Sequence, residues 1–256
     1  MRLTISGVKV KNRNPGVMFS FLVLLSLTML LSARSQTRNN GRDSAILHLQ
    51  KQGTATQLIV DGKPLLMLAG ETGNSSASNL EYMNAIWPKV EKMHLNALVV
   101  PVYWELLEPK EGVFDFTLVD SIIISARLHN MKLVFLWFGT WKNSMSCYVP
   151  MWVKADQERF PRARQKDGRA EEILTAFNNT NRTTDAHAFA ALMKHLRSID
   201  EKEQTVVLVQ VENEIGMIPD ARDHSKGANE SFRASVPAKL VSYLQEHKEK
   251  LNSGFR

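Results

Sequence analysis

Short apolar strands that alternate with amphipathic helices are the feature that most constrains the fold of this chain. The predicted strands cover residues 65–69, 97–102, 133–138 and 206–209. The predicted helices cover residues 78–93, 117–130 and 184–199, and a last one begins near Pro237. Continuous apolar strands separated by helices indicate a parallel sheet that is covered by helices. The sequence therefore predicts an α/β fold.

Three local signals predict a turn, a helix start and a helix irregularity within this pattern. Asp61-Gly62 separates the apolar residues 58–60 from residues 65–69, which predicts a β-hairpin. A capping box begins at Ser78 and opens the first helix. Pro88 lies inside that helix, so we expect the helix to be kinked or divided there.

Polar and aromatic residues gather directly after the predicted strands. They are Glu71, Tyr103-Trp104-Glu105, the segment 137–143, and Asn213-Glu214. A (β/α)8 TIM barrel builds its site in this way, at the carboxyl ends of its strands. A doubly wound sheet has similar periodicity, but the chain has no glycine-rich fingerprint for a nucleotide.

The count of strand–helix units limits the barrel prediction. We find about four units, ending near Arg256, whereas a complete barrel has eight. A loop of about 45 residues lies between the strand at 133–138 and the helix at 184–199. We expect residues 56–256 to be a partial (β/α)8 catalytic domain, truncated after about four β/α units.

The N-terminus has the three-part pattern of a secretory signal peptide. Basic residues precede an apolar run at residues 17–31, and small residues follow at Ser32, Ala33 and Ser35. The run is shorter than the roughly 20 residues that span a bilayer, although an uncleaved anchor is the alternative. We predict a signal peptide at residues 1–35, a flexible polar lead-in at 36–55, and export to the periplasm or outside the cell without stable membrane insertion after cleavage.

Charge and motifs exclude several other classes of function. Residues 1–35 hold five of the 32 basic residues and none of the 26 acidic ones, which leaves 27 basic against 26 acidic residues. This balance gives no reason to expect nucleic-acid binding. The sequence has one cysteine, no CxxC or HExxH motif and no glycine-rich phosphate loop. We predict neither a metal nor an organic cofactor.

The segment Glu212-Asn213-Glu214 carries the clearest chemistry. Strand alternation would send both glutamates to the same side of the sheet, with the asparagine between them. A carboxyl that apolar walls half shield has a raised pKa, and such a group can protonate a departing glycosidic oxygen. The alternative is that both glutamates cap the strand or pair with nearby basic residues.

Three blocks of sequence resemble glycoside hydrolase family 35, the retaining β-galactosidases. Residues 209–216, Val-Gln-Val-Glu-Asn-Glu-Ile-Gly, resemble its Q-x-E-N-E-Y-G signature. Residues 103–116 resemble its W-N-x-H-E-P…G…D-F block, and residues 150–152, Pro-Met-Trp, resemble its P-x-W-L. The blocks occur in the family's order over residues 55–245.

The resemblance implies a role for each matching residue. Glu214 corresponds to the general acid/base, Asn213 to the amide that bonds the sugar 2-hydroxyl, and Glu212 to a residue that supports the strand end. The chain departs from the family where Glu105 replaces an asparagine and where Thr140 replaces a galactose-binding glutamate. The residues that we expect to contact the sugar are Asn213, Glu71, Tyr103, Glu105, Trp141, Lys142 and Asn143.

The resemblance also implies a second glutamate, the nucleophile, which the family places after the seventh strand. Glu230, Glu246 and Glu249 do not follow a predicted strand, so we expect the nucleophile to be missing from this chain. The resulting hypothesis is a β-galactosidase acting on plant oligo- or polysaccharides. The alternatives are an inactive fragment, or a glycosidase of the same clan that acts on another sugar.

Overall fold

The computed structural model describes residues 46–142, 147–217 and 220–255. The chain divides into two units, residues 1–45 and 46–256, of which only the second is described. The predicted signal peptide and residues 36–45 of the predicted lead-in lie outside the described residues, as does Asn143.

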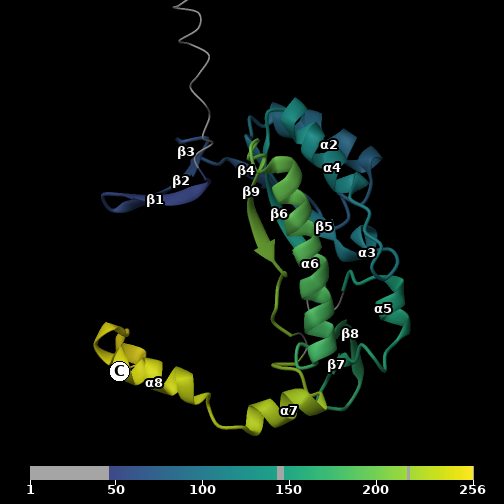
Figure 1. The fold of residues 1–256 in the computed structure, drawn as a ribbon, viewed down its shortest axis with the longest axis vertical. Coiled ribbons are helices and arrows are strands. Elements are labelled where there is room, and N and C mark those ends of the chain that lie inside the picture. Colours follow the sequence, from purple (N-terminus) through teal and green to yellow (C-terminus); the bar gives the residue numbers. More distant parts are fainter. Residues whose placement is uncertain (1–45, 143–146, 218–219, 256) are drawn as a thin grey trace, which may run out of the picture. The chain divides into compact units, whose positions relative to one another are not determined.

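A four-stranded parallel sheet forms the centre of the described unit (Figure 1). Its order is β4 (Ala69–Glu71), β5 (Ala97–Tyr103), β6 (Lys132–Phe138) and β9 (Val206–Val211). All three pairings are parallel, and β5 pairs with β6 along their full length from Ala97↔Lys132 to Tyr103↔Phe138. The predicted parallel α/β sheet is confirmed, with β4 and β9 at its edges.

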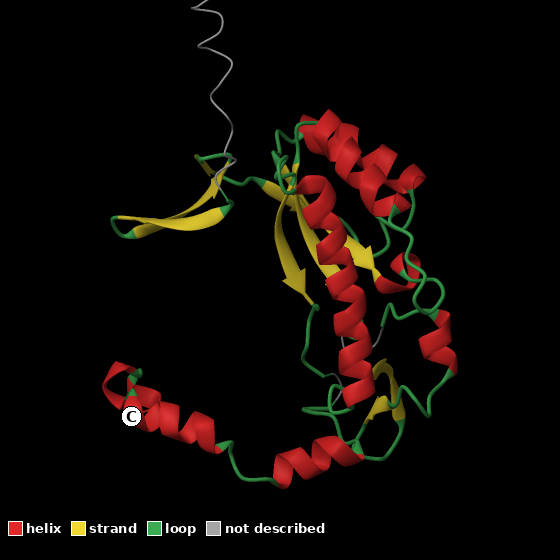
Figure 2. Cartoon of the chain, viewed as in Figure 1, coloured by secondary structure: helices red, strands yellow, loops and turns green. Residues whose placement is uncertain are grey.

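Three long helices connect these strands, as the periodicity predicts. They are α2 (Leu80–Lys92), α4 (Thr117–Leu128) and α6 (Asn179–Asp200). Figure 2 shows them as coiled ribbons beside the strands. Each helix buries one apolar stripe against the sheet, for example Val119, Ile122 and Ala126 in α4. The α2 helix continues through Pro88, and Asn79 rather than Ser78 caps it, accepting a hydrogen bond from the Tyr82 amide.

The N-terminal part of the described unit is a small antiparallel sheet. It contains β1 (His48–Gln52), β2 (Ala55–Val60) and β3 (Lys63–Leu65). The predicted hairpin is confirmed, because Asp61 and Gly62 join β2 to β3 with φ angles of 50° and 71°. Two details were wrong: residues 48–52 and Ala55 belong to paired strands rather than to a flexible lead-in, and 65–69 is not one strand.

The segment between β6 and α6 is structured, in contrast to the predicted loop. It contains α5 (Met151–Ala155) and a hairpin of β7 (Arg162–Arg164) and β8 (Ala170–Leu174). Its core residues Val149, Val153, Phe160 and Ile173 are fully buried, so burial of scattered apolar residues organises it. A further short helix, α3 (Trp104–Leu107), follows β5 directly.

The described C-terminal residues are helical. They form α7 (Lys226–Arg233), α8 (Ala238–Glu246) and the short 3₁₀ turns η1 (Lys248–Lys250) and η2 (Ser253–Phe255). The start of α8 after Pro237 agrees with the prediction, whereas α7 was not predicted. Within the described residues, no helix has the length and apolarity needed to cross a membrane.

Candidate functional site

The carboxyl ends of β6 and β9 lie side by side and carry the candidate site. The ladder between them reaches Trp137 and Val211, the last residue of β9. Beyond the ladder, the Asn213 amide donates to the Trp141 carbonyl over 3.4 Å. The loop 139–142 and the segment 212–214 are therefore neighbours, which is what the barrel prediction requires of polar residues after adjacent parallel strands.

Glu214 and Lys142 form an ion pair at this edge. The Lys142 Nζ lies 3.0 Å from Glu214 Oε2, and the side chains are 5% and 61% exposed, respectively. Lys142 also lies over the Phe138 ring, 5.3 Å from its centroid. The expectation of a half-shielded carboxyl at Glu214 is not met, because β9 is an edge strand and the side chain faces solvent.

Trp141 and Asn213 tie the same two segments together. The Trp141 indole donates to the Glu214 carbonyl over 3.1 Å, and the Asn213 side chain donates to the Lys142 carbonyl over 3.1 Å. The Asn213 oxygen accepts a hydrogen bond from Gln210. Sugar contact by these two residues stays a prediction, since their observed bonds are internal to the protein.

Glu212 has a different role from Glu214. Its carboxyl accepts hydrogen bonds from the Thr140 hydroxyl at 3.2 Å and from the Trp141 amide at 3.0 Å. The prediction that strand alternation sends both glutamates to one side does not hold. The strand ends at Val211, and Glu212 and Glu214 have φ angles of 61° and 47°, so the alternation of a strand no longer applies. Glu212 supports the strand end, as the sequence comparison suggested.

Asp185 on α6 is a site residue that sequence reasoning missed. It is 6% exposed and accepts hydrogen bonds from the Trp137 indole at 2.7 Å and the Thr140 amide at 2.8 Å. Glu212 hydrogen-bonds to it, and burial together with the adjacent Asp185 charge raises the pKa of Glu212 to about 10. The only available signal was a charged residue on the helix face that also carries Ala188, Leu192 and Leu196.

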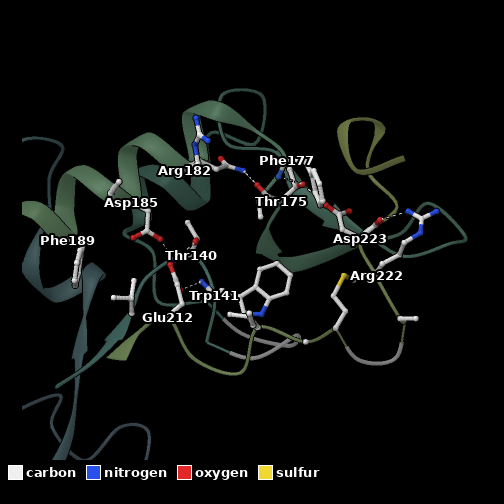
Figure 3. A pocket seen from close by; sticks show the side chains of 18 residues that line it. Thr140, Trp141, Thr175, Phe177, Arg182, Asp185, Phe189, Glu212, Arg222 and Asp223 are labelled. Carbon is white, nitrogen blue, oxygen red and sulfur yellow. Dashed lines mark hydrogen bonds between the residues drawn. The ribbon is translucent and has the colours of Figure 1, made fainter. Parts of the chain in front are cut away.

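A cavity of about 630 Å³ opens beside this carboxyl pair (Figure 3). Its walls are mostly apolar and come from α6, from the end of β9 and from residues 215–217 and 221–223. Thr140, Trp141, Asp185 and Glu212 line it, whereas Glu214 and Lys142 do not. The ion pair with Lys142 and the hydrogen bond from the Trp141 indole reach Glu214 outside this cavity.

The predicted residues on β4 and β5 lie apart from this cluster or serve as packing. Glu71 ends β4 and is exposed. Tyr103 is 3% exposed, and its hydroxyl donates to the Asn74 carbonyl at 2.7 Å and accepts from the Ala77 amide. Burial raises its pKa. Glu105 forms an ion pair with Lys154 at 2.9 Å. For these three residues, sugar contact stays a prediction.

No group of three or more His, Cys, Asp or Glu side chains suited to hold a metal ion occurs within the described part of the chain. Cys147 is buried, and its thiol donates to the Glu172 carbonyl at 3.2 Å. Burial raises the pKa of this thiol, which disfavours the reactive thiolate.

Comparison with solved structures identifies the fold. The chain is similar to a catalytic mutant of a GH42 β-galactosidase from G. stearothermophilus, with a TM-score of 0.51, 18% identity, and coverage of 71% of this chain and 25% of that one. It is also similar to the cold-adapted β-galactosidase from a Rahnella species, with a TM-score of 0.52, 18% identity, and coverage of 71% and 26%. The chain thus spans about a quarter of the length of these structures.

The fold and the strand-end carboxyl and amide groups fit the class of α/β glycoside hydrolases. The chain belongs to the family Glyco_hydro_42, described as beta-galactosidase, whose model matches residues 77–255. The resemblance to family 35 was therefore wrong about the family and correct about the β-galactosidase type. A search of curated proteins gave no match.

Proposed function

We propose that this chain provides the acid/base half of a retaining β-galactosidase, with Glu214 as the general acid/base and the nucleophile supplied from outside this chain. The observation that carries the proposal is the Glu214 carboxyl, which stands at the end of a parallel strand with 61% of its side chain exposed and Lys142 at 3.0 Å. It is accessible to a glycosidic oxygen, and its backbone is fixed through Trp141.

In the proposed reaction, Glu214 acts once as an acid and once as a base. It first protonates the glycosidic oxygen while the nucleophile attacks the anomeric carbon and forms a glycosyl-enzyme intermediate. Ionised Glu214 then deprotonates the water that releases the sugar. The Lys142 ammonium stabilises this ionised form through a charge-assisted hydrogen bond.

The position of the nucleophile follows from the requirements of a retaining enzyme. Its two carboxyl groups lie about 5–5.5 Å apart, so the nucleophile must end a strand on the same face as Glu214. Glu230 and Glu246 lie on α7 and α8, and Glu249 lies in η1. None of the three follows a strand of the parallel sheet, so we assign the nucleophile to none of them.

The proposed substrate is a terminal β-galactosyl residue of a plant oligo- or polysaccharide. The proteins of similar structure are β-galactosidases, and the family bears the same description. The alternative is a glucoside, mannoside or xylan substrate, which Thr140, bonded to Glu212, and Glu105 leave open. We further propose that the protein is exported by residues 1–35.

The second candidate is a catalytically inactive sugar-binding fragment. It is favoured by the exposed apolar side chains along the edge strand β9 and after it. Leu208, Val211 and Ile215 are 42%, 60% and 75% exposed, respectively. An uncovered apolar strand edge disfavours independent stability and promotes association.

Hydrolysis of 4-nitrophenyl β-galactoside distinguishes these candidates. We would assay residues 36–256 and, where the reading frame continues past Arg256, the complete reading-frame product, each beside Glu214→Gln and the control Glu230→Gln. Glu230 is a suitable control because it forms only a surface pair with Lys226, at 4.0 Å. We expect turnover only in the longer product, and a loss of about 10²–10⁴-fold in Glu214→Gln alone.

A general acid leaves a further signature in this assay. The loss of activity in Glu214→Gln should be smaller for a 2,4-dinitrophenyl galactoside, whose leaving group needs no protonation, than for lactose. Full activity of Glu214→Gln on lactose would overturn the acid/base role. Turnover by residues 36–256 alone would show that the nucleophile lies within this chain, and a preference for another aryl glycoside would replace the galactoside.

A further inference from the structure

We propose that Asp185 and Glu212 share one proton and act as positioning residues, clamping the loop 139–142 onto the segment that carries Glu214. This inference rests on the proposed function for the role of Glu214, but the clamp itself rests on contacts that do not depend on catalysis. Neither residue touches the reacting atoms in this proposal.

The clamp connects three elements through four hydrogen bonds. Asp185 on α6 accepts from the Trp137 indole at the end of β6 and from the Thr140 amide. Glu212, beyond β9, accepts from the Thr140 hydroxyl and the Trp141 amide. The two carboxyl groups thus both bond Thr140 and lie against each other beside the cavity (Figure 3).

A single proton between the two acids explains their close approach. Two carboxylates in hydrogen-bonding contact repel each other unless one is protonated. Asp185 already accepts two N–H groups, from the Trp137 indole and the Thr140 amide. Glu212 is the residue whose pKa burial and the Asp185 charge raise to about 10, so it carries the proton at neutral pH.

The other charged groups around the same cavity have different partners. Arg182 on α6 donates to Asn179, and Arg222 donates to the Asp223 carbonyl and lies over the Phe232 ring. Asp223 accepts from Arg164, Thr175 and Ser225. The bonds of these three residues lead away from the carboxyl pair.

The bonds of the clamp lead on to Glu214. Trp141, whose amide bonds Glu212, donates its indole N–H to the Glu214 carbonyl and accepts from the Asn213 amide. Lys142, the next residue, pairs with the Glu214 carboxyl. Loss of the clamp would therefore free both residues that hold Glu214.

The pair gives the folded state a defined dependence on pH. The pKa of Glu212 is raised in the folded state, so the folded state binds the proton more tightly than the unfolded state does. Its stabilising effect is complete below the ordinary glutamate pKa and is lost as the pH rises towards about 10. Wild-type stability should therefore fall between pH 5 and pH 9.

The test compares Glu212→Gln, Glu212→Ala and the control Glu230→Gln by thermal unfolding at pH 5, 7 and 9, using the full chain. An amide at position 212 can donate to Asp185 and still accept from the Trp141 amide through its one oxygen, without titrating. We expect the wild-type Tm to fall by about 4 °C or more from pH 5 to pH 9, and this fall to be absent in Glu212→Gln. Glu212→Ala should lower Tm at every pH, and Glu230→Gln should behave as the wild type.

Two results would overturn the proposal. One is an equal pH dependence in wild type and Glu212→Gln, which would show that Glu212 does not hold the proton. The other is a Glu212→Gln protein as unstable as Glu212→Ala, which would show that a donor to Asp185 does not replace the shared proton.

Kinetics of the complete reading-frame product separate this inference from the proposed function. Positioning predicts that Glu212→Ala lowers kcat at least tenfold with KM changed less than threefold, and that glutamine restores most of the loss. Unchanged kcat in Glu212→Ala, with the pH effect on Tm intact, would reduce the clamp to a structural role. If Glu214→Gln stays active while the Tm results hold, the assignment of Glu214 fails and the shared proton stands.

Discussion

The ends of β6 and β9 differ from the ends of β4 and β5, although all four strands are followed by polar or aromatic residues. After β6 and β9, Lys142, Trp141, Asn213 and Glu214 contact one another through ionic and hydrogen bonds. After β5, Tyr103 is buried in the core and Glu105 pairs with Lys154 of α5. The polar residues after β6 and β9 thus contact one another, whereas those after β5 are used in packing and in a separate ion pair.

The difference has a physical cause in what each strand end packs against. Helix α3 and the 147–153 segment cover the end of β5, so the Tyr103 hydroxyl must be satisfied by backbone groups of residues 74 and 77. The end of β9 is an edge with exposed Val211 and Ile215, so the Glu214 side chain stays accessible.

The largest expected effect comes from Gly139→Ala, which adds a side chain directly after the end of β6. An added Cβ would lie 2.5 Å from the Asp185 carboxylate and from the Trp137 indole nitrogen, both of which are buried. We expect a loss of about 1–3 kcal/mol in the free energy of unfolding, measured by urea denaturation. Gly216→Ala is the matched control, because nothing lies within 4 Å of its added Cβ. Equal stability of the two variants would contradict the tight contact.

The next effect, from Tyr103→Phe, tests whether the β5 end is packing or site. Removing the hydroxyl leaves the Asn74 carbonyl and the buried Ala77 amide without this partner. We expect a loss of about 1–2 kcal/mol by urea denaturation, against about 0.5 kcal/mol or less for the exposed Tyr243→Phe. A rise in KM for the galactoside without a loss of stability would instead support the predicted sugar contact of Tyr103.

The smallest expected effect compares two ion pairs of similar length. Lys142→Met breaks the 3.0 Å pair with Glu214, and Lys154→Met breaks the 2.9 Å pair with Glu105. We expect kcat/KM of the complete reading-frame product to fall about tenfold, or about 1.4 kcal/mol, in the first variant. The second should stay within about twofold, because a partly exposed pair contributes about 0–1 kcal/mol. Similar losses in both would remove the distinction between the two strand ends.

Sequence patterns predicted the parallel sheet because its strands β5 and β6 are apolar without interruption and its helices have apolar stripes. They failed where burial is not periodic. Phe160 and Ile173 are separated by charged residues, yet both are fully buried and pack the hairpin of β7 and β8. The sequence of this hairpin has no apolar–polar alternation that would predict its strands. Pro88 did not divide α2, since the helix packs Met83, Trp87 and Val90 into the core on both sides of it.

The candidate site was predictable in part for the same reason. Glu214, Asn213, Trp141 and Lys142 follow strands directly, so the barrel hypothesis brings them together. Asp185 lies on a helix more than 25 residues before Glu212, and no local pattern relates the two acids. The family itself required comparison of the whole segment 77–255, because the Glu-Asn-Glu signature did not distinguish family 35 from Glyco_hydro_42.

The sequence by itself determined the strand and helix periods, the strand-end position of Glu214 and the β-galactosidase type, since these depend on residues close together in the chain. Only the tertiary structure decided that Tyr103 is buried, that Glu212 and Glu214 bind different partners, and that Asp185 meets Glu212. Burial and hydrogen-bond satisfaction are set by groups that are distant in the sequence, so a protonation state such as that of Glu212 arises only when the fold assembles them.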